Sequence, residues 1–209
     1  LLGSQAFAER PPVPLALIAA VLNIDVANLF GATRDIAVLG GDQSSLGRVF
    51  DRAARSERLR VKVDRGSLLR GSFFRSDHFP LARAGVPALS WEHGNEYVGK
   101  PAGWGEEAWE TFNRDRYHQV TDEVLPWYTM EGALQQARVL ARVALAVGNA
   151  TAQPVWNPSS EFRAAGERRA GPPTPFLLRH STAAPRRHTA GSAATLAARG
   201  AGEPPAAPR

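Results

Sequence analysis

One apolar run limits the fold of this 209-residue chain more than any other feature. It begins at Leu15, continues through Ala-Leu-Ile-Ala-Ala-Val-Leu and ends in Asn23-Ile24-Asp25. A strand that is apolar along its whole length is typical of a sheet covered on both faces, and such sheets are usually parallel. Open α/β sheets bind ligands at the carboxyl ends of their strands, so Asp25 is either a ligand-binding carboxylate or the first residue of a turn.

The segments after this run alternate between strand and helix patterns. Strands are predicted over 35–41, 59–64 and 86–91, and an amphipathic helix is predicted to start after Ser44 or Ser45. A longer helix is predicted over 130–147, with one apolar face made of Leu134, Val139, Leu140, Val143, Ala144 and Val147. The alternation predicts an α/β fold, a three-layer αβα sandwich with a mostly parallel central sheet.

The stretch 76–122 holds most of the remaining polar candidates. It opens with Ser76-Asp77-His78-Phe79-Pro80 and ends in Tyr117-His118-Gln119-Val120-Thr121-Asp122. An imidazole binds a divalent metal through one ring nitrogen while a nearby carboxylate or carbonyl fixes the other. His118 is therefore a candidate metal ligand, and Asp122, four residues later, is a candidate carboxylate to orient its ring. The segment 95–116 is rich in glycine and aromatic residues, and we interpret it as a long loop that walls an active site.

Charge and cysteine content narrow the function classes. The absence of cysteine excludes disulfide scaffolds and Cys-ligated zinc, and no apolar run approaches the length of a bilayer span, so no transmembrane segment is expected. The formal charge of +5 is uneven: five arginines and one glutamate lie in 170–209, which leaves 20 basic and 19 acidic residues in 1–169. No ordered element carries a basic stripe with interleaved aromatics, so we expect no nucleic-acid partner.

The composition also divides the chain into a domain over 1–168 and a tail over 169–209. The tail is rich in Ala, Pro, Gly and Arg, and it has too few apolar residues to offset the entropy cost of folding. We therefore predict a disordered basic tail that can be removed without loss of the fold. A basic interaction tail and an out-of-frame product are the alternatives. At the other end, a helix over 1–10, capped by Ser4, is predicted to begin in mid-fold, with no visible signal peptide.

Several linked motifs resemble the co-catalytic double-zinc aminopeptidases, whose superfamily includes glutamate carboxypeptidases and glutaminyl cyclases. They follow the order and spacing of the back half of these enzymes: Leu1-Leu2-Gly3-Ser4-Gln5, Asn23-Ile24-Asp25, Arg75-Ser76-Asp77-His78-Phe79-Pro80, Ala84-Gly85-Val86-Pro87-Ala88, and Tyr117-His118-Gln119 with Asp122. The resemblance covers about 1–168. It implies a zinc-dependent exopeptidase of aminopeptidase type, which hydrolyses peptide bonds in peptides or proteins with a metal-activated water. It favours a secreted or periplasmic location over a cytoplasmic one.

The resemblance implies roles for three residues at the reaction centre. Asp25 matches the terminal carboxylate ligand of one zinc ion, and His118 matches the terminal imidazole ligand of the other. Tyr117 resembles a catalytic phenol that in some members hydrogen-bonds the developing oxyanion. If these assignments hold, the carboxylate and the imidazole should lie within about 8 Å of each other, the span of two ligands on neighbouring metals.

Four further residues resemble groups that surround the ligands or the substrate pocket: Ser76, Asp77, His78 and Asp122. For His78 and Asp122 we expect a structural role, either capping a helix or orienting a ligand. His93 matches no role in the family, so we expect a surface or loop histidine.

The family's remaining site residues lie upstream of the matched motifs. They are a His-x-Asp pair, which supplies a ligand and the bridging carboxylate, and a Glu-Glu pair just before Leu-Leu-Gly-Ser, which supplies the general base and another ligand. We therefore expect a fold truncated at its N-terminal side, with two of five ligands, that binds metal weakly and is inactive alone. A non-catalytic binding homologue and a glutaminyl cyclase-like acyltransferase with one zinc are the alternatives, and the upstream ligand set would separate them.

Overall fold

The computed structural model describes residues 1–63 and 69–170. These residues belong to one compact unit, whose last helix, α7 (Arg163–Ala170), includes residues 169 and 170. The rest of the predicted tail, 171–209, lies outside the described residues, so its disorder stays a prediction. Within the described ranges, none of the helices combines the length and apolarity that a bilayer span requires.

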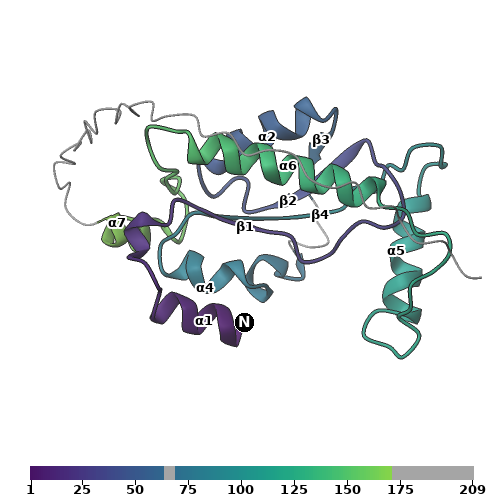
Figure 1. Ribbon diagram of the computed structural model, residues 1–209, viewed down its shortest axis with the longest axis horizontal. Coiled ribbons are helices and arrows are strands. Elements are labelled where there is room, and N and C mark those ends of the chain that lie inside the picture. Colours follow the sequence, from purple (N-terminus) through teal and green to yellow (C-terminus); the bar gives the residue numbers. More distant parts are fainter. Residues whose placement is uncertain (64–68, 171–209) are drawn as a thin grey trace, which may run out of the picture. The chain divides into compact units, whose positions relative to one another are not determined.

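A four-stranded sheet of order β1-β4-β2-β3 forms the middle layer (Figure 1). β1 (Val21–Asn23) pairs in parallel with β4 (Ala88–Glu92), and β2 (Asp35–Leu39) pairs in parallel with β3 (Arg60–Lys62). The two pairs join through an antiparallel contact between β2 and β4. The predicted α/β class and mostly parallel sheet are therefore confirmed.

Helices cover both faces of this sheet (Figure 1). α2 (Leu46–Ser56) and α6 (Glu131–Gly148) pack on one face. α4 (His78–Arg83) packs on the other face, and α1 (Leu2–Glu9) packs against α4. α5 (Trp104–Asp115) and α7 lie beyond opposite ends of the strands. Single 3₁₀ turns occupy Leu15–Leu17 and Ser72–Arg75. This is the predicted three-layer arrangement.

Apolar side chains of β4 alternate between the two faces of the sheet, so both faces must be covered by helices. Leu89 and Trp91 point into the core under α2 and α6, where Trp91 packs on Phe50 with ring centroids 5.3 Å apart. Ala88 points to the other face, into a core with Phe73. Because each fully buried large side chain contributes about 1.5–3 kcal/mol, the two apolar faces hold the layers together.

The strand predicted from the long apolar run was largely wrong in extent. Pairing begins only at Val21, whose amide donates to Pro87 O (2.9 Å), because the partner strand starts at Ala88. The residues before it form the 3₁₀ turn at Leu15–Leu17, which follows Pro14. Asp25 nevertheless follows the carboxyl end of this short strand, as predicted.

The interpretation of 95–116 as a long loop was also wrong in part, because this segment contains α5. Trp104, Ala108, Trp109 and Phe112 recur at helical spacing and pack around Phe30. The neighbouring glycines hid this pattern, and Gly103 before the helix has a left-handed φ of 83°. A helix therefore forms the wall that the sequence predicted as a loop.

Two smaller expectations failed as well. Ser4 does not cap α1: the N-cap is Leu1, and Ser4 lies inside the first turn, where its Oγ donates to Leu1 O (2.9 Å). Leu134 and Ala144 of the predicted apolar face of α6 are exposed, whereas Val139 and Val143 are fully buried. The helix itself is confirmed, and four of the six residues of its predicted face meet the core, because Leu140 and Val147 pack against it partly buried.

Candidate functional site

Asp25 lies just beyond β1 with its carboxylate exposed and held from one side. Ser76 Oγ donates to Asp25 Oδ2 (3.2 Å) and accepts from Asn23 Nδ2 (3.0 Å). Asn23 Nδ2 also donates to Ser90 Oγ of β4 (3.1 Å). We call Asn23, Asp25, Ser76 and Ser90 the Asp25 network. It fixes one carboxylate oxygen and leaves acceptor capacity on the other, as a metal-binding carboxylate requires.

Asp77, the N-cap of α4, joins this helix to α1. Ser4 Oγ donates to Asp77 Oδ1 (2.8 Å), and the amino group of Leu1 lies 2.9 Å from the same oxygen. The hydrogen bond from this amino group, followed by that from Ser4, lowers the pKa of the exposed Asp77 carboxyl below its usual value. Its visible contacts are therefore structural.

His78, the first residue of α4, is fully buried. Its ring lies edge-on to Phe73 with centroids 4.5 Å apart, and neither ring nitrogen has a hydrogen-bond partner within the part of the chain that the structure describes. Burial lowers its pKa from 6.5 to about 4, so the imidazole is neutral at neutral pH. No described contact shows it capping a helix or orienting a ligand, and its visible role is packing.

Tyr117 and His118 follow the end of α5. Their rings stack with centroids 3.9 Å apart, and both residues are exposed. His118 has a left-handed φ of 59°, a backbone conformation that is costly for a non-glycine residue and is found preferentially at functional sites. Asp122 is also exposed, and its amide donates to Gln119 O (3.1 Å), which closes a turn after His118.

A cavity of about 510 Å³ lies between the segments that carry these residues. Val26, the residue after Asp25, and Tyr117, the residue before His118, both line it. The full lining is Val26, Arg70, Ser72, Glu92, His93, Asn95, Glu106, Trp109, Glu110, Phe112, Asn113 and Tyr117. Two segments about ninety positions apart in the sequence thus meet at one hollow, which we call the edge cavity.

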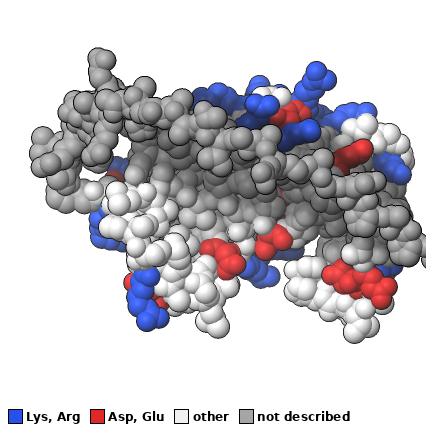
Figure 2. Space-filling model, in the orientation of Figure 1, with Lys and Arg blue, Asp and Glu red and all other residues white. Residues whose placement is uncertain are grey.

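The edge cavity is also lined by His93, which was predicted to be a surface or loop histidine without a role in the site. His93 directly follows β4, is half-buried, and stacks face to face on Trp109 with centroids 3.7 Å apart and planes 6° apart. The signal for it was positional, since polar residues at the carboxyl end of a strand commonly face ligands in α/β folds. The acidic side chains over α5 are visible in Figure 2 at the lower right.

A buried hydrogen-bond chain holds the aromatic wall of the edge cavity in place. Trp109 Nε1 donates to Tyr97 Oη (2.9 Å), and Tyr97 Oη donates to Asn28 Oδ1 (2.8 Å). Asn28 is 1% exposed, and its Nδ2 donates to Gly31 O (3.0 Å). Burial raises the pKa of Tyr97, so the phenol stays protonated and can donate. This chain fixes α5 against the loop after β1.

Asp35 secures the loop between β4 and α5. It is 1% exposed and accepts hydrogen bonds from the amides of Asn95 (3.1 Å) and Glu96 (2.8 Å). Lys62 of β3 completes the set, with its Nζ 3.2 Å from Asp35 Oδ2. Hydrogen bonding to Glu96 is the main cause that raises the pKa of Lys62, so the ammonium stays charged. Asp35 is thus a structural carboxylate whose oxygens are already used.

The donors present do not complete a zinc centre. Across residues 1–63 and 69–170 no group of three or more His, Asp or Glu side chains lies close enough to hold a metal ion. Catalytic zinc sites take three protein ligands and structural sites take four. Asp25 and His118 are of the types that zinc accepts, but these two side chains do not suffice to hold it.

Comparison with protein families decides the class of this chain. The family model described as peptidase family M28 matches residues 1–143, which is more than half of the 209-residue chain. The chain belongs to peptidase family M28. No curated protein and no solved structure matched it. The resemblance to zinc aminopeptidases and carboxypeptidases is thereby confirmed.

Membership in M28 establishes a metallopeptidase-type hydrolase, from a zinc-dependent family whose substrates are peptides. It does not test the individual assignments. The role of Asp25 and His118 as ligands, the distance between them, and the catalytic role of Tyr117 stay predictions. The structure of this M28 chain gives the geometry around these residues. The Asp25 carboxylate is oriented by Ser76, the His118 ring stacks on Tyr117, and residues adjacent to Asp25 and His118 line the edge cavity.

Proposed function

We propose that this M28 chain contributes to the active site of an aminopeptidase-type exopeptidase, an enzyme that removes residues from the free amino terminus of peptides. One observation carries the proposal: the residues next to Asp25 and His118 line the same edge cavity. A peptide whose terminal residue entered this cavity would place its first peptide bond beside both side chains. Family membership supports the hydrolase class, and the cavity supports the location of the chemistry.

The lining of the edge cavity supports recognition of a free amino terminus. It includes three glutamates, Glu92, Glu106 and Glu110, and one arginine, Arg70. A negative surface of this kind favours a cationic ammonium group over a neutral, acylated terminus. The exposed Tyr117 phenol at the same cavity can donate a hydrogen bond to the oxygen that becomes negative when the carbonyl is attacked.

In this proposal Asp25 and His118 each supply one metal ligand, and Ser76 fixes the orientation of the Asp25 carboxylate. The other ligands and the general base would come from the family's His-x-Asp and Glu-Glu motifs. These 209 residues alone should therefore cleave no aminoacyl-4-nitroanilide. Zinc-dependent turnover by this chain alone would show that the ligands are wrongly assigned.

The decisive assay uses this chain joined to an upstream M28 segment that carries those two motifs. We expect hydrolysis of aminoacyl-4-nitroanilides and none of their N-acetyl forms. His118→Ala should lower kcat/KM at least about 100-fold, because a metal ligand is lost, whereas Asp42→Asn, in the turn after β2, should leave it unchanged. Equal cleavage of acetylated substrates would contradict the aminopeptidase type. Ammonia release from glutaminyl peptides would indicate a glutaminyl cyclase, and peptide binding without turnover would indicate a binding homologue.

A further inference from the structure

A second cavity, of about 480 Å³, lies at the edge of the sheet opposite to Asp25. Gly85 and Pro87, which precede β4, line it together with Ser45 and Arg48 at the start of α2. The remaining wall comes from residues 153–158 and from α7, at the left of Figure 1. We call it the distal cavity, because β1 and β4 run in parallel away from it toward Asp25.

The distal cavity has a firm apolar wall. Trp156 is 7% exposed, and its Nε1 donates to Gly85 O (3.0 Å), which fixes the indole against the start of β4. Pro87, Pro154 and Pro158 add apolar surface with little conformational freedom. A pre-formed apolar hollow of several hundred cubic ångströms with a few polar groups is the usual form of a small-molecule site.

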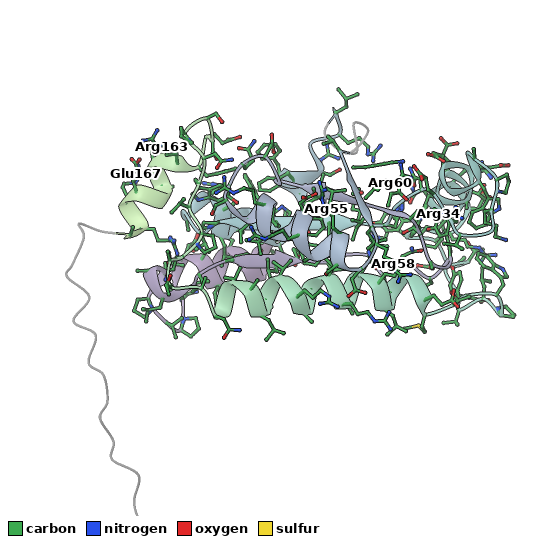
Figure 3. The ribbon with its side chains drawn as sticks, turned by 90° about the horizontal axis from the view of Figure 1, so that it is seen from above. Arg34, Arg55, Arg58, Arg60, Arg163 and Glu167 are labelled. Carbon is green, nitrogen blue, oxygen red and sulfur yellow. The ribbon has the colours of Figure 1, made fainter. Side chains whose placement is uncertain are left out.

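The charged groups of the distal cavity are unevenly matched. Arg163 is paired with Glu167 one turn later on α7, with Nε 2.8 Å from Oε1 (Figure 3). Arg48 and Arg169 also line the cavity, and no salt bridge joins either of them to a carboxylate of the described residues. The lining thus has two guanidinium groups in excess of its carboxylates.

Arg169 shows this imbalance most clearly. Its Nη1 donates to the carbonyls of Leu15 (3.1 Å) and Ile18 (2.6 Å), and its Nη2 makes a longer hydrogen bond to Gln153 Oε1 (3.4 Å), which together lock the side chain in place. Its Nε is buried and has no acceptor among residues 1–63 and 69–170. Burial lowers the pKa of the guanidinium, as expected when a cation lacks a counter-ion. A buried donor without an acceptor calls for a partner, and an anion suits this one best.

We propose that the distal cavity binds a small apolar carboxylate. The carboxylate would accept from Arg169 and Arg48, since planar guanidinium groups match carboxylates in geometry and charge. The apolar part would pack on Trp156 and the prolines. The site lies away from the edge cavity and does not depend on the peptidase proposal.

The test is isothermal titration calorimetry on the full chain with 3-phenylpropionate and hexanoate. The matched control ligand is 3-phenylpropanamide, which has the same shape without the charge. We expect one saturable site for the carboxylates and binding at least about 10-fold weaker for the amide, the size of effect that a charge-assisted hydrogen bond gives. Equal binding of the amide, or no binding of either carboxylate, would overturn the proposal.

Variants locate the site. Arg48→Gln and Arg169→Gln should each weaken carboxylate binding by about 10-fold. Arg169 also hydrogen-bonds the 3₁₀ turn at Leu15–Leu17, so Arg169→Gln could lower thermal stability as well as binding. Arg48 is exposed, so Arg48→Gln tests binding without this effect on the fold. Arg52→Gln is the matched control, because Arg52 lies one turn later on α2 and does not line the distal cavity. Wild-type affinity in Arg48→Gln, or an equal loss in Arg52→Gln, would overturn the assignment.

Discussion

Two carboxylates, Asp25 after β1 and Asp35 in β2, differ in how fully their oxygens are paired, although only β4 separates the two strands in the sheet. Asp35 is 1% exposed, and two amides and the Lys62 ammonium take up its oxygens. Asp25 is exposed, and among the described residues its carboxylate accepts a hydrogen bond only from Ser76. A buried carboxylate must be fully paired to be tolerated, whereas a ligand or catalytic carboxylate needs lone pairs in reserve. The comparison assigns Asp35 to the fold and shows that Asp25 keeps the spare acceptor capacity that its proposed role as a metal ligand requires.

The largest effect should come from breaking the structural partner. Asp35→Ala removes the acceptor of two amides and one partner of Lys62, so we expect a loss of about 3 kcal/mol in the free energy of unfolding. Asp25→Asn should change it by no more than about 0.5 kcal/mol, as for other exposed positions. Urea unfolding monitored by circular dichroism measures both. Equal losses in the two variants would remove the distinction.

Acid should reveal the next largest effect, through His78. Its pKa is 6.5 when unfolded and about 4 in the fold, so the unfolded state binds the proton more tightly. The stability contributed by the neutral ring is complete above pH 6.5 and is lost as the pH falls toward 4, by up to about 3 kcal/mol. His78→Phe keeps an aromatic ring at this position without the titration. The variant should therefore show a flatter unfolding profile over this window, and an unchanged profile would contradict the account.

The buried chain beside the edge cavity should give a smaller effect. Tyr97→Phe leaves Trp109 Nε1 without its acceptor, and Asn28 Oδ1 keeps only the amide of Phe30. We expect a loss of about 1–2 kcal/mol. Tyr128→Phe is the control, because Tyr128 packs in the same aromatic cluster and no hydrogen bond of its hydroxyl is observed among the described residues. Thermal unfolding of both variants checks this, and equal losses would indicate that only ring packing matters.

Local sequence patterns correctly predicted the helices and strands whose apolar residues recur at the regular spacing of the element and pack into the core. α2 and β2 follow their apolar spacing closely. The apolar run before Asp25 failed because the extent of a strand depends on its partner, and β4 offers only three paired positions to β1. α5 was missed because glycines interrupt its pattern and tertiary packing on Phe30 stabilises it.

Only motifs in the sequence pointed to a candidate site. They predicted Asp25, Ser76, Tyr117 and His118 as site residues; Tyr117 and Val26, the residue after Asp25, line the edge cavity, and the roles themselves stay predictions. No sequence pattern indicated the roles of Asn28, Asp35 or Arg169, because their main partners lie dozens of positions away in the chain. Such residues resemble ordinary polar positions until the fold buries them.

Zinc affinity is the most direct test of the central claim that Asp25, and not Asp35, is kept for chemistry. The measurement compares zinc binding and thermal unfolding in the chain joined to its upstream M28 motifs. Ser76→Ala should weaken zinc by about 10-fold, as loss of a ligand-orienting hydrogen bond does, and Asp25→Asn by at least about 100-fold. Both variants should unfold within about 1–2 °C of the wild type, because Asp25 is exposed and Asn23 Nδ2 keeps its hydrogen bond to Ser90 when Ser76 is replaced. Unchanged zinc affinity in Asp25→Asn would contradict the account.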